Sequence, residues 1–420
     1  MSKPILTALL TLILSALLTG CNLRSPEGES GVPLASTPVA GDPSSVVIAS
    51  NSVFQPEAVT NPPFNSLTYG IQAFLWWDGG EVGQNLDRVR MMGFSHVKQG
   101  FAWRDLEPRP GEWDFTQSDR IISELEARNL KLIARLGETP DWALTNIATG
   151  DVHDSPPSDM AAWGNFCGTL ATQYAGRIAA YQVWNEPNLS REWGGQPPDA
   201  AAYTELLRVC SEAIHAADPN AIVISAGLAP TGNEDAFALR DDLYLDRMYQ
   251  AGFQQYADVV GAHAPGFSRP EVDPSEPEQG RWATFRRVED LRKLMITHGD
   301  AARQMAILET GWTTDQQNPD YAWFAVTPEE QAANLEAAYA YAAANWRPWV
   351  GLMSSIYIAN PSWTSDNEEW WWAITEQRPE FIFDRPAFDA LLRMPKVCGS
   401  HVTPRLTTPE TPLVPDNPCR

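Results

Sequence analysis

Two glutamates that each follow an apolar run are the residues best placed to do chemistry. Glu186 lies in the segment YQVWNEPN at residues 181–188, and Glu309 lies in the segment MAILETGW at residues 305–312. The apolar residues before each glutamate favour a β-strand, so both carboxylates are expected at a strand-to-loop junction. Pro187 also pushes Glu186 toward an extended conformation, because a residue before proline avoids the helical region. A carboxylate held in this way has little freedom, as a general acid or a nucleophile requires.

The chemistry that suits such a pair is hydrolysis of a glycosidic bond. One carboxylic acid protonates the leaving oxygen, while the other carboxylate attacks the anomeric carbon and forms a covalent intermediate that water resolves. Asn185 directly precedes Glu186, and its amide is able to hydrogen-bond a sugar hydroxyl. The alternative for Glu309 is a structural salt bridge, since ion-pair networks also place acids at strand ends.

The elements that must position these residues alternate between strands and helices along most of the chain. The eight predicted strands are centred on Tyr69, Val97, Ile133, Val183, Ile224, Val260, Ile307 and Ile356, and helical spacing of apolar residues follows each. This count predicts an α/β fold, a single (β/α)₈ TIM barrel over residues 64–396, with catalytic groups at the C-terminal ends of the strands. A doubly wound open sheet is the alternative, but no Gly-rich turn follows the first strand.

The segment WNEPN at residues 184–188 on a fourth strand, with Glu309 on a seventh, resembles the clan A retaining glycoside hydrolases. These are (β/α)₈ enzymes that include families 5 and 39, and the resemblance covers residues 65–394. It implies that Glu186 is the acid/base and Glu309 the nucleophile. It also implies that Asn185 is the partner of the 2-hydroxyl group of the sugar.

Further substrate contacts follow from the same resemblance. His263 ends the sixth strand, where these families carry a histidine or tyrosine beside the nucleophile; a satisfied core histidine is the alternative. Lys98 lies on the second strand, where clan members often have an arginine, and is a candidate contact. Trp363 lies just after the eighth predicted strand, a position similar to that of the tryptophan on which the sugar packs in this clan. Trp76 and Trp103 also follow strands, and their rings are candidates for stacking on sugars.

Two segments between the predicted elements are expected to be loops. Residues 103–113 are dense in proline and charged residues, and residues 370–372 are three consecutive tryptophans. Stacking of further sugar units and anchoring of the loop are both open as roles for these tryptophans.

Composition limits the partners of the protein. The formal charge of −23 disfavours nucleic acids and anionic membranes, whose phosphates would be repelled. A neutral carbohydrate substrate fits better, and the 17 tryptophans offer flat apolar faces that match sugar rings. The six histidines lack close pairing, so no metal or other cofactor is expected. We expect a monomer.

The start of the chain predicts export. An apolar run at residues 5–18 and the residues LTG before Cys21 resemble a bacterial lipoprotein signal over residues 1–20. Cys21 would then carry the lipid that anchors the protein at the bacterial cell surface, its one contact with a membrane. Ordinary secretory cleavage nearby is the alternative. Residues 21–63, rich in Ser, Pro, Gly, Ala and Val, predict a flexible tether.

Export to an oxidising compartment favours disulfides among the other cysteines. Cys167 and Cys210 fall in two consecutive helical segments, while Cys398 and Cys419 bracket a Pro-rich tail at residues 397–420, so we pair them in that order. A zinc site is not expected, because the short paired spacings of such sites are lacking.

These observations favour an exported, lipid-anchored retaining glycosidase that cleaves poly- or oligosaccharides by double displacement. The alternative is a surface carbohydrate-binding lipoprotein that kept the barrel and lost turnover. The presence of both glutamates favours the enzyme. Two departures from the family pattern keep the alternative open: Lys98 in place of arginine, and Pro265 where an aromatic residue often follows the histidine.

Overall fold

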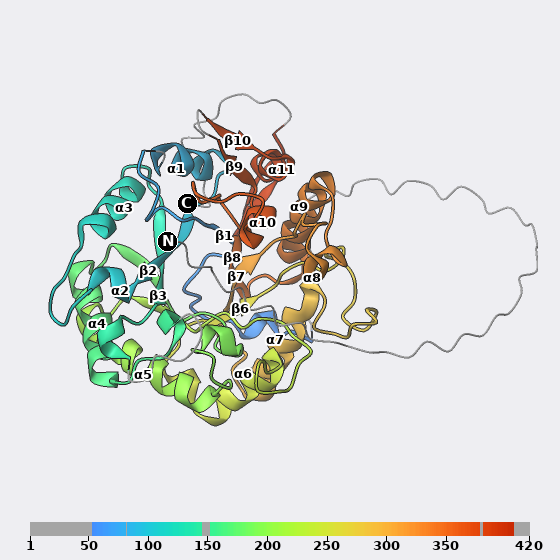
Figure 1. Ribbon diagram of the computed structural model, residues 1–420. Helices are drawn as coiled ribbons and strands as arrows, with labels where there is room; N and C mark the ends of the chain where they lie inside the picture. Colours follow the sequence, from blue (N-terminus) through green and yellow to red (C-terminus); the bar gives the residue numbers. More distant parts are fainter. Residues whose placement is uncertain (1–52, 81, 145–151, 379–380, 407–420) are drawn as a thin grey trace, which may run out of the picture. The chain divides into compact units, whose positions relative to one another are not determined.

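Eight parallel strands form the centre of the fold (Figure 1). The structure is a computed structural model of the chain and describes residues 53–80, 82–144, 152–378 and 381–406. The strands are β1 (Thr68–Gln72), β2 (His96–Ala102), β3 (Lys131–Gly137), β4 (Ile178–Val183), β5 (Ile222–Ile224), β6 (Val260–His263), β7 (Met305–Thr310) and β8 (Val350–Ser355). The eight predicted strand centres fall in these strands or directly beside them.

The strands close into a barrel. Their hydrogen-bonded order is β5, β4, β3, β2, β1, β8, β7 and β6, and all of these pairings are parallel. A parallel bridge between Ile224 and Val259, directly before β6, joins the two edges. The prediction of a (β/α)₈ barrel is therefore confirmed, and the open doubly wound sheet is excluded.

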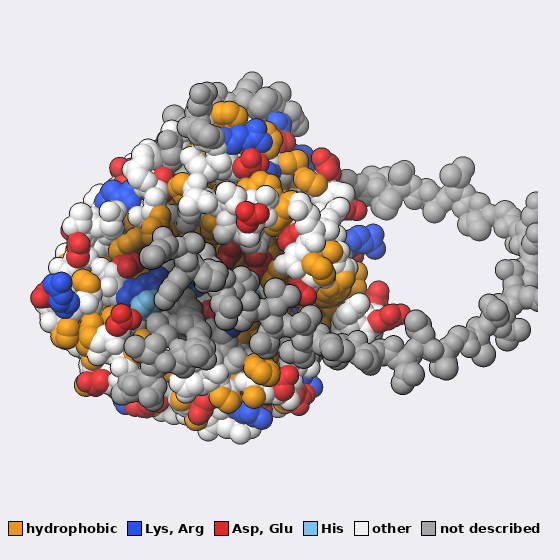
Figure 2. Space-filling view, viewed as in Figure 1, with side chains coloured by type: hydrophobic (Ala, Val, Ile, Leu, Met, Phe, Trp, Pro, Cys, Tyr) orange, Lys and Arg blue, Asp and Glu red, His pale blue; other side chains and the backbone are white. Residues whose placement is uncertain are grey.

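Helices surround the strands (Figure 1). The longer helices are α1 (Val82–Met91), α3 (Thr116–Glu126), α4 (Met160–Gln173), α5 (Ala200–Ala217), α6 (Asp241–Gln250), α7 (Val288–Thr297), α9 (Pro328–Asn345) and α11 (Pro386–Arg393). Thr327 starts α9 through a capping box with Glu330, which satisfies backbone N–H groups that a helix start leaves unpaired. Figure 2 shows acidic side chains in a hollow at the centre of the face seen in Figure 1.

Apolar residues fill both sides of the strands, which explains their nearly continuous apolar runs. The cluster inside the barrel consists of Phe64, Ile133, Ala180, Ile224, Val259, Ala306, Leu308 and Leu352. A larger cluster lies between the strands and the helices. At the start of the barrel, Gln304 exchanges two hydrogen bonds of 3.0 Å with the backbone of Phe64 and so fixes this ring.

Two segments that were predicted as loops contain short helices. Trp103–Leu106 forms α2 directly after β2, and Glu368–Trp372 forms α10 beyond β8. Trp103 and Trp372 are buried, so contacts with the rest of the protein outweigh the loop-like composition around them. The loop prediction is wrong for these two turns.

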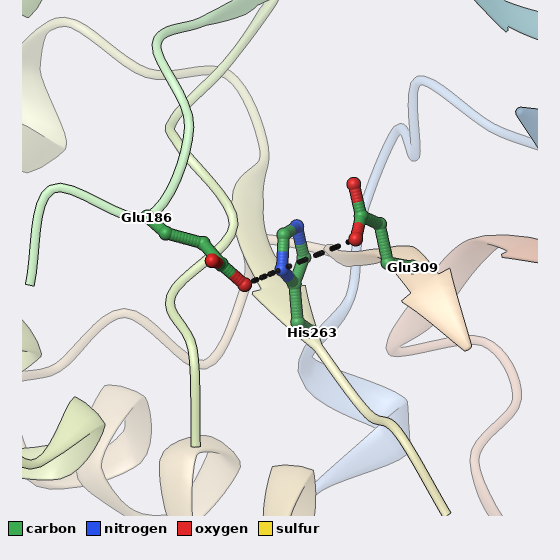
Figure 3. A group of neighbouring side chains, drawn as sticks. All are labelled: Glu186, His263 and Glu309. Carbon is green, nitrogen blue, oxygen red and sulfur yellow. Dashed lines mark hydrogen bonds and ion pairs between the residues drawn. The ribbon is translucent and has the colours of Figure 1, made fainter. Parts of the chain in front are cut away.

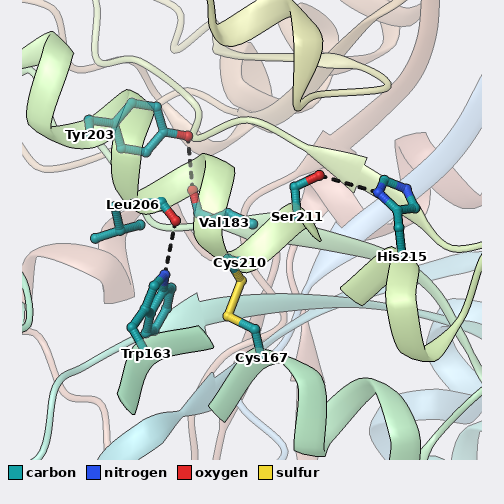
Figure 4. Close-up of a disulfide and its surroundings, with 8 residues drawn as sticks. All are labelled: Trp163, Cys167, Val183, Tyr203, Leu206, Cys210, Ser211 and His215. Atoms are coloured by element: carbon teal, nitrogen blue, oxygen red, sulfur yellow. Dashed lines mark hydrogen bonds between the residues drawn. A yellow bond between two sulfur atoms is a disulfide. The ribbon is translucent and has the colours of Figure 1, made fainter. Parts of the chain in front are cut away.

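The disulfide predicted between Cys167 and Cys210 is present (Figure 4). It joins α4 to α5, the helices before and after β4, with the two Cα atoms 5.3 Å apart. Tyr203 of α5 donates its hydroxyl to the carbonyl oxygen of Val183, the last residue of β4, at 3.0 Å (Figure 4). The covalent link and this hydrogen bond together hold the strand end from which Glu186 extends.

Part of the predicted tether packs on the barrel. The ring of Phe54 lies 5.5 Å from that of Trp349, and Arg292 donates to the carbonyl oxygen of Phe54 at 3.0 Å. Val59 also packs against the core, so residues 54–59 of the predicted tether belong to the folded part of the chain.

The C-terminal end also contributes regular structure. β11 (Lys396–Cys398) pairs with β12 (His401–Thr403) in an antiparallel hairpin. Cys398 takes part in a disulfide, but its predicted partner Cys419 lies outside the described residues, so that pairing stays a prediction. The signal, Cys21 and the first part of the tether also lie outside them. In the described part of the chain, no helix is both long and apolar enough to span a membrane.

Candidate active site

Glu186 lies on the loop directly after β4 in an unusual backbone conformation. The φ angles are 71° at Trp184 and 39° at Glu186, in the left-handed region that residues other than glycine rarely adopt. The prediction that Pro187 keeps Glu186 extended is therefore wrong. The N–H of Glu186 donates to the carbonyl oxygen of Gly227 at 3.0 Å, a tertiary contact that local preference does not include. Strain of this kind is concentrated at functional sites.

Asn188 ties this loop to the one after β5. Its buried Nδ2 donates to the carbonyl oxygens of Ala229 at 2.8 Å and Leu239 at 2.9 Å. Its Oδ1 accepts from the N–H of Ala229 at 3.0 Å. Because these buried polar groups satisfy one another, the loop has one well-defined conformation, and Glu186 is positioned by the loop as a whole.

Glu309, near the end of β7, forms a buried ion pair with Lys98 of β2. Lys98 Nζ lies 2.7 Å from Glu309 Oε1, and the lysine is fully buried. Burial raises the pKa of Glu309, but the charges of Lys98 and His263 outweigh it and hold this pKa at about 2. Burial likewise lowers the pKa of Lys98, against the effect of Glu309. Glu309 is therefore a carboxylate at neutral pH.

His263, the last residue of β6, lies between the two glutamates (Figure 3). Its Nδ1 is 2.7 Å from Glu186 Oε1 and 3.8 Å from Glu309 Oε2. Gly227 makes room for the ring, because a Cβ atom there would lie 2.1 Å from Nε2. Nε2 is buried and has no hydrogen-bond partner among the described residues. The alternative of a satisfied core histidine is therefore wrong.

The spacing of these side chains suits one stereochemical course. Carboxylate oxygens of Glu186 and Glu309 and Nδ1 of His263 all lie within 4.8 Å of one another. This separation matches the roughly 5 Å of a retaining pair and is shorter than the roughly 6.5–9.5 Å of an inverting pair. Such spacing also suits a metal ion, but Lys98 already supplies a positive charge 2.7 Å from Glu309.

Arg191 and Glu192, which were not predicted from the sequence, complete the site on the side of Glu186. Arg191 places one guanidinium nitrogen 3.6 Å from Glu186 and another 3.6 Å from Glu192. Asn185 Nδ2 donates to Glu192 Oε2 at 3.4 Å. Burial, reinforced by the charge of Glu186, raises the pKa of Glu192 to about 7. The signal that could have identified Arg191 and Glu192 is that they form a pair of opposite charges shortly after the WNEPN segment.

Tyr357, directly beyond β8, brings an aromatic ring to the site. Burial and the nearby charges of Glu309 and Glu186 raise the pKa of Tyr357 well above its usual value. Its ring centroid lies 5.4 Å from that of Trp363, which is half-buried, and 5.4 Å from that of Phe74. Trp363 is thus part of an aromatic group with Tyr357 and Phe74 beyond the ends of β8 and β1. Tyr357 was missed, although an aromatic residue beyond an apolar strand was a usable signal.

The two other tryptophans predicted to stack on sugars differ from each other. Trp76 is half-buried and packs edge-on against Phe101, with the ring centroids 5.7 Å apart. Trp103 is fully buried, stacks on Phe166 at 5.3 Å and donates its Nε1 to Glu107 at 2.7 Å. The prediction that Trp103 contacts substrate is wrong, because α2 turns this side chain into the layer between strands and helices.

Comparison with known proteins gives partial matches to glycoside hydrolases. The family model Glyco_hydro_42, described as beta-galactosidase, matches residues 73–147, a segment that contains Lys98 but neither glutamate. Endo-1,4-beta-xylanase A of Phanerodontia chrysosporium is 26% identical over 154 residues, which cover 34% of this chain and 36% of that protein. Beta-xylosidase of Geobacillus stearothermophilus is 27% identical over 135 residues, covering 29% and 26%. The chain spans roughly a quarter to a third of the length of these relatives.

Solved structures extend the likeness to the whole barrel. A family 39 glycoside hydrolase from Bacteroides cellulosilyticus WH2 has a TM-score of 0.57 at 18% identity, covering 80% of this chain and 64% of that one. A family 39 beta-xylosidase from Caulobacter crescentus has a TM-score of 0.55 at 17% identity, covering 81% and 74%. The chain therefore has the barrel fold that these glycoside hydrolases share.

Substitution of Glu192 by Gln is expected to raise the thermal stability near pH 8 and to leave it nearly unchanged near pH 4. The pKa of about 7 in the folded protein lies above the ordinary value of 4.5, so folding favours the protonated form. That contribution is fully present below the ordinary value and is lost as the pH rises through about 7, whereas the amide stays neutral throughout. Melting temperatures of both proteins at the two pH values measure the effect.

Glu205→Gln is the matched control for this measurement. Glu205 lies on α5 in contact with Arg208, and this hydrogen bond lowers its pKa, so the amide brings no gain near pH 8. An equal gain for Glu192→Gln at both pH values would contradict the expectation.

Proposed function

We propose that this protein is a retaining glycoside hydrolase that cleaves O-glycosidic bonds of poly- or oligosaccharides. The observation that carries the proposal is the pair of glutamates beyond β4 and near the end of β7, with carboxylate oxygens within 4.8 Å. The partial matches to a xylanase and a beta-xylosidase support the reaction class. Because of those names, xylan and aryl β-xylosides are the first substrates to test.

In the first step, Glu309 attacks the anomeric carbon while Glu186 gives its proton to the leaving oxygen. Lys98 keeps Glu309 ionised and binds Oε1, so Oε2 remains for the bond to the sugar. The low pKa of Glu309, about 2, also makes it a good leaving group when water resolves the covalent intermediate.

Glu186 acts as acid in the first step and as base in the second. It takes a proton from the attacking water, which restores the acid for the next cycle. His263 holds Glu186 through the contact of 2.7 Å between Nδ1 and Oε1. Asn185, whose Nδ2 donates to Glu192, directly precedes Glu186 and is the proposed partner of the 2-hydroxyl of the sugar that Glu309 attacks.

The alternative of a binding protein without turnover has no particular support. Lys98, which keeps Glu309 charged, contacts Glu309 directly. His263 contacts Glu186 and lies close to Glu309. Lys98, one of the two departures that left this alternative open, is the direct partner of the proposed nucleophile.

Glu186→Gln and Glu309→Gln are each expected to lower kcat/KM by roughly 10³-fold or more, because each removes a group that transfers a proton or forms the covalent bond. Release of reducing sugar from an oligosaccharide, whose leaving oxygen needs protonation, measures activity, and NMR records the anomer formed first. Retention of configuration is expected. Glu329→Gln, on the exposed first turn of α9, is the control and should keep full activity.

Azide separates the two roles. Added azide should restore activity to Glu309→Ala and give a glycosyl azide of inverted configuration, because only one displacement remains. With Glu186→Ala it should give a glycosyl azide of retained configuration, because azide then attacks the covalent intermediate. Full activity of either Gln variant, or inversion by the wild type, would disprove the assignment.

Lys98→Met is expected to lower kcat/KM near pH 5 by roughly 100-fold and to move the acidic limb of the pH profile upward. Without the lysine, burial dominates and raises the pKa of Glu309, so the nucleophile is protonated over a wider acidic range. Lys131→Met, at the exposed start of β3, is the control. An unchanged acidic limb in Lys98→Met would show that the ion pair does not control the charge of Glu309.

We further propose that the protein is exported and anchored by a lipid on Cys21. The support is the sequence of residues 1–21 alone. In a bacterial host, the wild type should incorporate labelled palmitate and enter the detergent phase on Triton X-114 partitioning, whereas Cys21→Ser should do neither. Incorporation by Cys21→Ser would refute the anchor.

A further inference from the structure

Three aromatic residues form a partly exposed surface on the loops after β6 and β7. Phe267 and Trp282 lie between β6 and α7, and Trp323 directly follows α8 (Pro319–Ala322). The ring of Phe267 lies 5.1 Å from that of Trp282 and 5.8 Å from that of Trp323, the second pair being stacked at 12°. Trp323 is 48% exposed. We call these three residues the aromatic platform; Figure 2 shows hydrophobic side chains in the region of α8.

A cavity of about 240 Å³ opens beside the aromatic platform. Phe267 and Trp323 line it, together with Glu276 and Gln279, which are exposed. A carboxylate and an amide beside flat apolar rings are the groups that bind sugars, since rings pack on the C–H faces and polar groups bind the hydroxyls.

The loop holds these rings in fixed positions. Trp282 donates its Nε1 to the carbonyl oxygen of Gln279 at 2.7 Å and lies so close to Gly232 that a Cβ atom there would be 2.6 Å from the indole nitrogen. Gly266, next to Phe267, leaves no room for a Cβ atom beside the buried ring of Trp312. Rings that are already fixed lose little entropy when a ligand binds.

Aromatic contacts connect the platform with the candidate active site. Phe324 lies 5.0 Å from Phe267 and 4.7 Å from Trp323, measured between ring centroids. Phe324 and Ile356 belong to one buried cluster, against which Phe267 and Tyr357 pack. The charges of Glu309 and Glu186 contribute to the raised pKa of Tyr357. The platform therefore lies on the loops that follow the two strands carrying His263 and Glu309, where a sugar chain that extends from the glutamates over these loops would reach it.

We propose that the aromatic platform is a distal subsite that binds a neutral polysaccharide at sugar units beyond those joined by the cleaved bond. The inference rests on the proposed function, because the occupant is the continuation of the substrate chain. The formal charge of −23 disfavours polyanionic glycans and leaves neutral ones. The subsite adds affinity for polymers and contributes nothing to a substrate with a single sugar.

The experiment compares binding of polymers with turnover of a small substrate. Affinity electrophoresis in native gels that contain xylan, mixed-linkage β-glucan, galactan or mannan measures binding, in the Glu309→Gln background so that the polymer stays intact. Trp323→Ala is expected to weaken retention by at least about fivefold, while Trp323→Tyr, which keeps a flat ring, retains most of it. With Glu309 intact, Trp323→Ala should keep kcat/KM on the aryl glycoside within about twofold.

Two controls keep the result specific. Phe383→Ala removes a 39% exposed ring on β10 (Ile382–Asp384) and should change neither readout. Trp282→Ala tests the platform at a second residue, and the melting temperature of each variant verifies folding.

Each outcome decides between the proposals. Retention by none of the gels, or retention that Trp323→Ala and Trp282→Ala leave unchanged, overturns the subsite. Equal losses on polymer and aryl glycoside also overturn it, since they indicate a disturbed active site. Platform-dependent retention without hydrolysis of any glycoside would support the subsite and refute the proposed function.

Discussion

A carboxyl group buried inside a barrel stays ionised when a cation lies beside it, and here the cation is Lys98, 2.7 Å from Glu309. The two residues come from β2 and β7, which are separated in the sheet by β1 and β8. Their contact therefore crosses the interior and requires the closed barrel. Loss of either partner would leave a buried charge unpaired, so the ion pair couples the integrity of the barrel to the chemical state of Glu309.

The two glutamates are held in contrasting ways, which suits different roles. Glu309 extends from β7 at a point where the pairing with both neighbouring strands shifts register, and it is kept ionised by Lys98. Glu186 lies on a loop with left-handed backbone, which Asn188 connects to the next loop of the barrel. His263 contacts both and links the rigid strand end to the loop.

The tryptophans illustrate why composition alone is a weak guide to binding. Most of the large rings that follow strands serve the core, as Trp103 and Trp312 do. Trp323 instead follows the short helix α8 on the loop beyond β7 and remains about half exposed. A ring becomes available to a sugar through the direction in which its loop places it.

The sequence by itself determined the order of the elements and the position of both glutamates at strand ends. Apolar periodicity and the residues that start and end helices are local signals, so they can be identified in the sequence without the structure. The pairing of Cys167 with Cys210 followed from two consecutive helices around one strand. Only the tertiary structure decided which side chains meet: Lys98 with Glu309, His263 between the glutamates, Arg191 and Glu192 beside Glu186, Tyr357 at the site and Trp103 in the core. These contacts join strands far apart in the chain, and they overrode a local preference at Glu186, because closure of the barrel sets side-chain directions that no local pattern records.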